Sequence, residues 1–309
     1  MSPTANDSPV VVGVDSSRNA LDAVRWAASE ARLRGLPLRI LHAAPYTADH
    51  TRPALRRARN IVARAFTVAR RAQPDLRVTT HSTEDTPVRS LLDAAEHAEL
   101  LVLGMGGGQR FGEALIRSVA LEVCGRASCP VVVVRGAWAR EGRDVVVGVD
   151  RPASDAAALE VAFADARRRG GQVVVLHALH GAGPLRDHVT GHEVSSRTAA
   201  MARLSDELVP WAARFSDVPM RIEVVRDQPS AALLVASVKA RLVVLGDRSH
   251  SAPARVLFGS TSREVLRRCG APVVVVNAAE AAGAAATMAA APASAGTQVQ
   301  DPHDRGELS

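Results

Sequence analysis

Short apolar runs alternate with longer amphipathic segments along most of the chain. The run 10–14, VVVGV, is short and rich in β-branched residues, so it predicts a buried strand. Polar residues that favour helix N-caps follow it, and apolar residues then recur at helical spacing until Gly35 and Pro37, which predicts a helix. The same alternation predicts strands at 38–41, 76–80, 100–103 and 131–134, and helices at 53–71, 87–98 and from 118 onward.

This pattern occurs twice. VVVGVD stands at both 10–15 and 145–150, and the stretch 101–134 returns as 243–276. A repeat of this length indicates a duplicated domain, with a short insertion in the second copy between His177 and Pro229. The second copy predicts strands at 145–149, 173–176, 220–225, 242–245 and 273–276, and helices at 154–169, 194–215, 229–239 and 262–268.

Strands that alternate with helices pair in parallel and carry helices on both faces. We therefore expect an α/β protein with two tandem open parallel five-stranded sheets, each flavodoxin-like with strand order 3-2-1-4-5. The expected parts are a loose tail at 1–8, domains at 9–136 and 144–277 (the first and second half below), a linker at 137–143 and a disordered Ala/Pro/Gly-rich tail at 278–309. A weak Ala-rich helix over 279–291 is the alternative for that tail.

Composition excludes several classes of protein. The net charge is +6, but the arginines are spread along helical segments, so we interpret most of them as solvated. Without a groove-reading helix or an aromatic platform, nucleic acid is an unlikely partner. Three cysteines without metal-ligand spacing and without a signal peptide favour a reduced, cytoplasmic protein. No apolar segment approaches the roughly 20 residues that span a bilayer.

Candidate chemistry gathers at the carboxyl ends of the strands, where ligands bind in open parallel sheets. Asp15 follows the first strand and Gly104 ends the fourth, and Asp150 and Gly246 stand likewise in the second half. The hydroxyl residues 260–262 begin a helix, whose unpaired N–H groups favour an anion. An acidic residue beside an anion-binding loop suits a nucleotide.

On these residues the chain resembles the universal stress protein family, over 10–135 and 144–277. Nucleotide-binding members carry G-x2-G-x9-G-[S/T] after the fourth strand, an aspartate after the first strand and an apolar backbone contact to adenine after the second. The resemblance implies the adenine nucleotide α-hydrolase-like form of the fold, ATP as the ligand with Mg²⁺ left open, and two domains packed as a pseudo-dimer through their last strands. Whether two chains form a homodimer also stays open.

In the second half, the resemblance assigns to the nucleotide Asp150, Ala178, Gly246, Ser249, Gly259, Ser260, Thr261 and Ser262. The run from Gly259 to Ser262 keeps the family motif. Ser249 replaces the second glycine, and Asp247 places a negative charge in the phosphate loop, which disfavours the ligand unless a metal or Arg248 offsets it.

In the first half, the assigned residues are Asp15, Ala43, Gly104, Gly107, Ser118 and Val119. Arg117 stands where the third glycine belongs, and it either blocks the pocket or swings out to meet the phosphate. The second half is therefore the better candidate. The alternative is that the glycines only make strand-to-helix turns and that the aspartates only cap helices.

The sequence offers no catalytic set. His42 and His177 follow the second strand of each half without a nucleophile and an orienting partner, so we expect partly buried, hydrogen-bonded histidines. There is no P-loop and no early GxGxxG. The favoured function is a regulatory ATP-binding module of the stress response with an unknown protein partner, and not an enzyme beyond slow ATP hydrolysis or autophosphorylation. The alternatives are an ATP-independent interaction platform and, less favoured, an adenylating or electron-transfer enzyme.

The substitution Arg117→Gly tests whether Arg117 closes the first half. If it does, the variant gains a nucleotide site or tightens an existing one, because glycine leaves room for the phosphate. Calorimetric titration with ATP and Mg²⁺ measures the number of sites and their affinity. Unchanged values would count against the block.

Overall fold

The computed structural model describes residues 8–43, 52–105, 119–136, 142–179, 191–246 and 259–277. The elements of the first half are β1 (Val10–Gly13), α1 (Arg18–Arg34), β2 (Leu38–Ala43), α2 (Arg52–Ala72), β3 (Val78–Thr83), α3 (Pro87–Ala95), β4 (Leu100–Gly104), α4 (Val119–Cys124) and β5 (Val131–Val134). Those of the second half are β6 (Val145–Gly148), α5 (Ala156–Arg169), β7 (Val173–Leu179), α6 (Gly191–Arg214), β8 (Met220–Arg226), α7 (Pro229–Ser237), β9 (Leu242–Gly246), α8 (Ser260–Arg268) and β10 (Val273–Val276).

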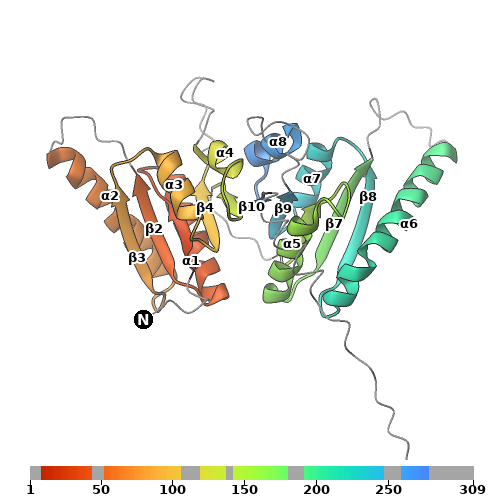
Figure 1. Ribbon diagram of the computed structural model, residues 1–309, viewed down its shortest axis with the longest axis horizontal. Helices are drawn as coiled ribbons and strands as arrows, with labels where there is room; N and C mark the ends of the chain where they lie inside the picture. Colours follow the sequence, from red (N-terminus) through yellow and green to blue (C-terminus); the bar gives the residue numbers. More distant parts are fainter. Residues whose placement is uncertain are drawn as a thin grey trace, which may run out of the picture.

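The strands form one sheet of ten, in the order β3-β2-β1-β4-β5-β10-β9-β6-β7-β8 (Figure 1). Each half is parallel and has the predicted order 3-2-1-4-5. The halves meet where β5 pairs antiparallel with β10, which places Val132 opposite Val274. The predicted α/β fold and its joining through the last strands are confirmed, and the two predicted sheets are continuous with each other.

Burial explains why these residues form these elements. β5 and β10 are runs of four valines that are buried along their whole length, as expected of parallel strands covered on both faces. Helix α1 starts at Ser17, whose hydroxyl accepts a hydrogen bond from the Ala20 N–H at 3.1 Å, and ends at Gly35 in the left-handed region. Gly170 ends α5 in the same way.

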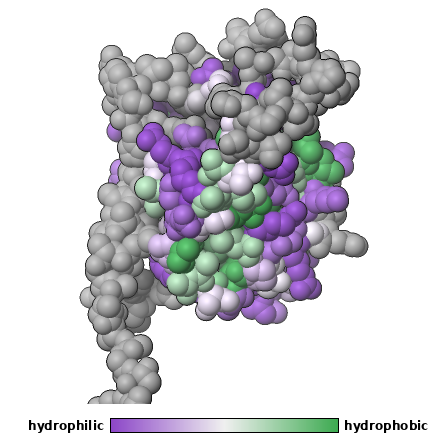
Figure 2. Space-filling model, turned by 90° about the vertical axis from the view of Figure 1, so that its right-hand side faces the viewer, coloured by the Kyte–Doolittle hydropathy of each residue, from purple (hydrophilic) through white to green (hydrophobic). Residues whose placement is uncertain are grey.

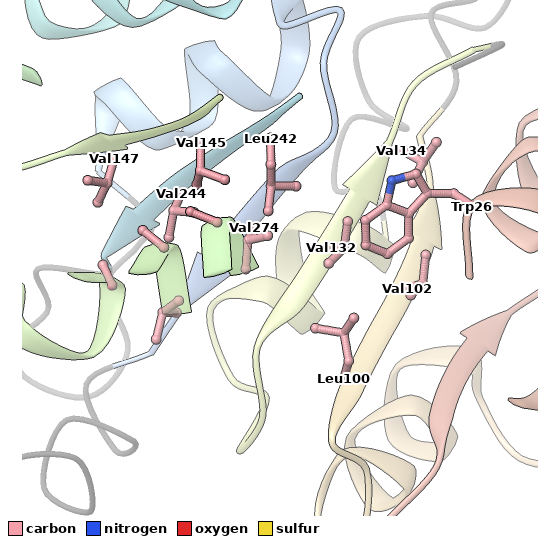
Figure 3. Packing of buried hydrophobic residues seen from close by; sticks show 14 of the residues in the cluster. Trp26, Leu100, Val102, Val132, Val134, Val145, Val147, Leu242, Val244 and Val274 are labelled. Carbon is pink, nitrogen blue, oxygen red and sulfur yellow. The ribbon is translucent and has the colours of Figure 1, made fainter. Parts of the chain in front are cut away.

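The core lies in two layers, one on each side of the sheet. One layer packs under α1, α2, α5 and α6 and runs through both halves without a break. Figure 3 shows this layer at the junction, with Trp26 beside Val132 and Val134 and with Val274 on the neighbouring strand of the second half. The other layer packs under α3, α4, α7 and α8. Trp26 and Trp211 are both buried in the core.

Boundaries differ from the prediction where apolar patterning is weak. β3 was expected at 76–80 but lies at Val78–Thr83, because this edge strand is mostly exposed and carries no buried stripe that marks its ends. Helix α8 begins at Ser260 rather than at residue 262. The predicted tails and most of the predicted linker lie outside the described residues. Among the helices described, none combines the length and the apolarity that a membrane crossing requires.

A buried ionic cluster joins α1 to α5 across the two halves. Glu30 of α1 accepts from Arg34 at 2.6 Å and from Arg169 of α5 at 2.5 Å. Asp165 of α5 accepts from Arg169 at 2.6 Å. Glu30 is 2% exposed and Asp165 is fully buried. Glu30 and Arg34 occupy the same positions in the first repeat as Asp165 and Arg169 in the second, so the cluster is pseudo-symmetric.

The two carboxylates of this cluster respond differently to it. Burial opposes the charge of Glu30, but Arg34 and Arg169 outweigh burial and lower the pKa of Glu30. Burial, reinforced by the Glu30 carboxylate, raises the pKa of Asp165. Glu30 therefore contributes stability that is present above its unfolded pKa and is lost as the pH falls through its folded pKa.

Replacement of Glu30 by Gln should destabilise the protein by about 3–5 kcal/mol at neutral pH, because it leaves Arg169 and Arg34 short of a buried partner. The difference from wild type should begin to shrink below pH 4.5, the ordinary pKa of Glu, and should go on shrinking until the pH falls through the lower folded pKa of Glu30, where Glu30 itself takes up a proton. Urea unfolding at several pH values measures both effects. The control is Glu122→Gln, which breaks an exposed pair with Arg126 and should change little. Equal losses in the two variants would contradict a role for the buried cluster.

Candidate functional site

A cavity of about 280 Å³ opens in the second half at the carboxyl ends of β6, β7 and β9, beside the N-terminus of α8. The predicted residues that line it are Asp150, Ala178, Gly246, Gly259, Ser260, Thr261 and Ser262. Ser249 lies outside the described residues. The position agrees with the rule that ligands bind where the strand order of an open sheet reverses.

Apolar side chains form the other wall of the cavity. The lining residues that sequence reasoning missed are Gly148, Val149, Asp155, Leu176, Pro229, Leu233 and Leu245. Most of them are core residues at the ends of strands or on the inner side of α7, and their pattern in the sequence indicates only burial. An apolar wall opposite a polar rim is the usual composition of a small-molecule site.

The first turn of α8 supplies the polar rim. Gly259 is the N-cap residue, and its carbonyl accepts from the Arg263 N–H at 3.1 Å. The backbone N–H groups at 260–262 come before the first residue whose N–H group can bond to a carbonyl of the same helix, so they are left for other acceptors. No acidic residue stands in this turn, so the positive end of the helix faces the cavity without a competing carboxylate in its first turn.

Asp155 shapes the turn that holds Asp150. Its Oδ2 accepts from the Asp150 N–H at 2.8 Å and from the Arg151 N–H at 3.2 Å, and the residue is 4% exposed. These two bonds fix the backbone at the end of β6 and offset part of the carboxylate's charge. An aspartate just before an alanine-rich helix is a cap signal that could have identified Asp155 in the sequence.

Two of the predicted glycines have a packing reason that needs no ligand. A side chain at Gly104 would stand 2.5 Å from the Asn19 carbonyl oxygen, and one at Gly246 would stand 3.0 Å from Asp155 Oδ1. The strand-end glycines therefore let the helices α1 and α5 approach the sheet. Gly259 differs, because a side chain there would meet no atom of the described residues within 4 Å and its φ of −54° suits any residue.

The first half does not show the same assembly in its described part. Asp15, Ala43 and Gly104 follow or end β1, β2 and β4, and Val119 begins α4. Gly107, Arg117 and Ser118 lie outside the described residues, so their predicted roles stay predictions. Asp15 lines a different cavity of about 370 Å³, which faces the arginine-rich side of α2.

The remaining candidates are structural. His42 and His177 are buried, and each places Nδ1 within 2.8 and 2.9 Å, respectively, of the carbonyl oxygens of Val14 and Val149. This confirms the expectation of hydrogen-bonded histidines at the strand ends. All three cysteines are buried. The described residues contain no group of three or more His, Cys, Asp or Glu side chains placed to hold a metal ion.

Comparison with known proteins gives a consistent result. The model of the universal stress protein family matches residues 8–135 and 142–277. A universal stress protein of Mycolicibacterium smegmatis is 32% identical over 296 residues, which cover 89% of this chain and 99% of that protein. One from Mycobacterium tuberculosis is 32% identical over 290 residues, or 86% and 95% of the two chains. The crystal structure of a universal stress protein from Archaeoglobus fulgidus superposes with a TM-score of 0.63 at 17% identity, covering 87% of this chain and 96% of that one.

Alanine substitutions distinguish a glycine that tight packing requires from a glycine that borders open space. Gly104→Ala should cost about 1–3 kcal/mol of unfolding free energy, because the new methyl group meets backbone atoms that cannot move aside. Gly259→Ala should leave stability unchanged or slightly higher. Urea denaturation of both variants against wild type provides the comparison. A destabilised Gly259→Ala would show that Gly259 is also a packing glycine.

Proposed function

Because the chain belongs to the universal stress protein family, we propose that its second half binds ATP and that the bound nucleotide regulates contact with a protein partner. The observation that carries the proposal is the cavity at the ends of β6, β7 and β9. It gathers, in one place, an aspartate, an apolar wall and the N-terminus of a helix.

The phosphates belong at the first turn of α8. The N–H groups and hydroxyls at 260–262 are donors for phosphate oxygens, and the positive end of the helix favours their charge. Gly259 leaves the space that a phosphate needs. In the part of the chain that the structure describes, a side chain there would meet no atom within 4 Å, so these residues give the glycine no packing role that competes with this explanation.

The nucleoside belongs on the opposite side of the cavity. Val149, Leu176 and Ala178 offer an apolar surface to the base, and Asp150 is within the same cavity as an acceptor for a ribose hydroxyl or a base amino group. The volume of about 280 Å³ is near the lower end of small-molecule sites, so the nucleoside fills it and the phosphates extend along α8.

Charge limits how the nucleotide can lie. Asp150 and Asp155 both line the cavity, and their carboxylates repel phosphate. The phosphates therefore lie towards α8 and away from the β6 turn. Mg²⁺ fits as a companion of the nucleotide, since it commonly binds through phosphate oxygens and one or two carboxylates rather than through a protein cage.

The proposal is binding without efficient catalysis. Among the described residues that line the cavity there are hydroxyls but no histidine or lysine that could act as a base beside them. At most, Ser260 or Ser262 accepts a phosphoryl group slowly. The second candidate function is an ATP-independent platform. It is favoured by the finding that Gly104 and Gly246 are explained by packing alone.

The deciding experiment is calorimetric titration of the full chain with ATP and Mg²⁺. The Gly259→Glu variant should lose the site in the second half, because the carboxylate fills the phosphate position and repels the ligand. Gly259→Ala is the uncharged comparison, and it should lose less affinity than Gly259→Glu because a methyl group takes only part of the open volume. Thermal unfolding checks that both variants remain folded.

The outcomes distinguish the hypotheses. Loss in Gly259→Glu alone supports the second-half site. Binding that survives Gly259→Glu moves the site to the first half. A wild-type protein that binds no ATP favours the platform function.

A further inference from the structure

Helices α3 and α7 hold the same position in the two halves but differ on their outer faces. Both have nine residues, begin with proline, and bury a leucine against the sheet, Leu91 in α3 and Leu233 in α7. At a constant offset, three outward positions of α3 are occupied by Arg89, Asp93 and Glu96, all exposed. The matching positions of α7 are occupied by Ala231, Val235 and Val238.

The outer face of α7 is therefore an apolar surface in contact with solvent. Val235 is 73% exposed and Val238, at the C-cap, is 66% exposed. Together with the partly exposed Ala231 they follow the spacing i, i+4, i+7, which places them on one face of the helix, as in a face that packs against another element. Single exposed apolar residues are ordinary, but an aligned set marks an interaction surface.

The charges at the two ends of this helix indicate the partner. Asp227 precedes the first residue of α7 by two positions, and Lys239 follows its last residue by two. Both are exposed, and neither forms an ion pair within the described residues. When two such helices pack antiparallel, Asp227 of each lies near Lys239 of the other. A parallel arrangement would place like charges together.

We propose that α7 is a self-association surface, through which two molecules of this chain pair their α7 helices antiparallel about a two-fold axis. Such an axis makes the interface self-complementary, as isologous dimers require. The edges β5 and β10 are already paired within one molecule, so a second molecule cannot use them. The proposal concerns the outer side of α7 and does not rest on nucleotide binding.

The interface is small, so association should be weak and concentration-dependent. Sedimentation velocity of the full chain, from low to high micromolar protein, should show a monomer–dimer equilibrium. The double variant Val235→Asp and Val238→Glu gives α7 the residues that α3 carries, and should raise the dissociation constant at least about tenfold, because both molecules lose buried apolar area. It should fold normally, since α3 tolerates the same charges at these positions.

The matched control is Val209→Asp on α6. Val209 is 60% exposed and lies outside the α7 stripe. The face of the molecule at the α6 and β8 end also shows apolar residues between hydrophilic ones (Figure 2). The control therefore tests whether replacing any exposed valine weakens the dimer. Dissociation by Val209→Asp but not by the α7 variant would overturn the proposal. A wild-type chain that stays monomeric at all concentrations would also overturn it, and α7 would then face a different partner.

Charge exchange tests the antiparallel arrangement. Asp227→Lys and Lys239→Asp should each weaken the dimer, because each brings like charges together at both ends. The chain that carries both changes should recover most of the affinity. Weakening by the single changes with recovery in the double supports the proposal, and failure to recover contradicts the antiparallel pairing.

Discussion

The antiparallel pairing of β5 with β10 is the interaction on which the rest of the structure depends. Both strands are unbroken runs of valine with no solvated face, so neither could remain as an open edge in water. Their pairing makes two five-stranded sheets into one and aligns the halves about a pseudo-two-fold axis. It also brings α1 against α5, so that one hydrophobic layer continues through both halves. The carboxyl ends of both parallel sets are left open for ligands.

The ionic cluster between α1 and α5 shows what that alignment demands. A buried ion pair adds little net stability compared with apolar packing, but a buried charge that loses its partner is costly. Glu30 and Arg169 therefore disfavour any arrangement of the two halves that would separate them. Arginine suits this place better than lysine. Within the cluster, Glu30 and Asp165 outweigh burial and raise the pKa of Arg169. At its margin, burial, assisted by repulsion from Arg169, lowers the pKa of Arg241 to about 10, which leaves Arg241 charged at neutral pH. A lysine starts from a lower pKa and would approach neutrality under the same influences.

The strands and their order could be predicted because they depend on local pattern and on the repeat, and so could the glycine and hydroxyl residues that line the second-half cavity. The apolar wall of the cavity could not, because its residues look like ordinary core residues in the sequence. The ionic cluster could not. Arg34 and Arg169 lie on helices that look like ordinary solvated arginine-rich segments, and only the pairing of the halves buries them. Asp155 could have been recognised as a helix cap, but its bonds to the turn at Asp150 do not follow from the sequence. The ends of β3 were wrong because an exposed edge strand has no buried stripe to define them.

Duplication within one chain explains why some positions differ between the halves and others do not. In a symmetric dimer of identical chains each substitution appears at both sites. In a duplicated chain the two copies can differ, as Arg117 and Gly259 do at matching positions. Gly104 and Gly246 have stayed the same, and both are explained by the approach of a helix to the sheet. A glycine that both halves keep is therefore weak evidence for a ligand. A glycine that one half keeps without any packing reason is stronger evidence, and Gly259 meets that criterion in the part of the chain that the structure describes.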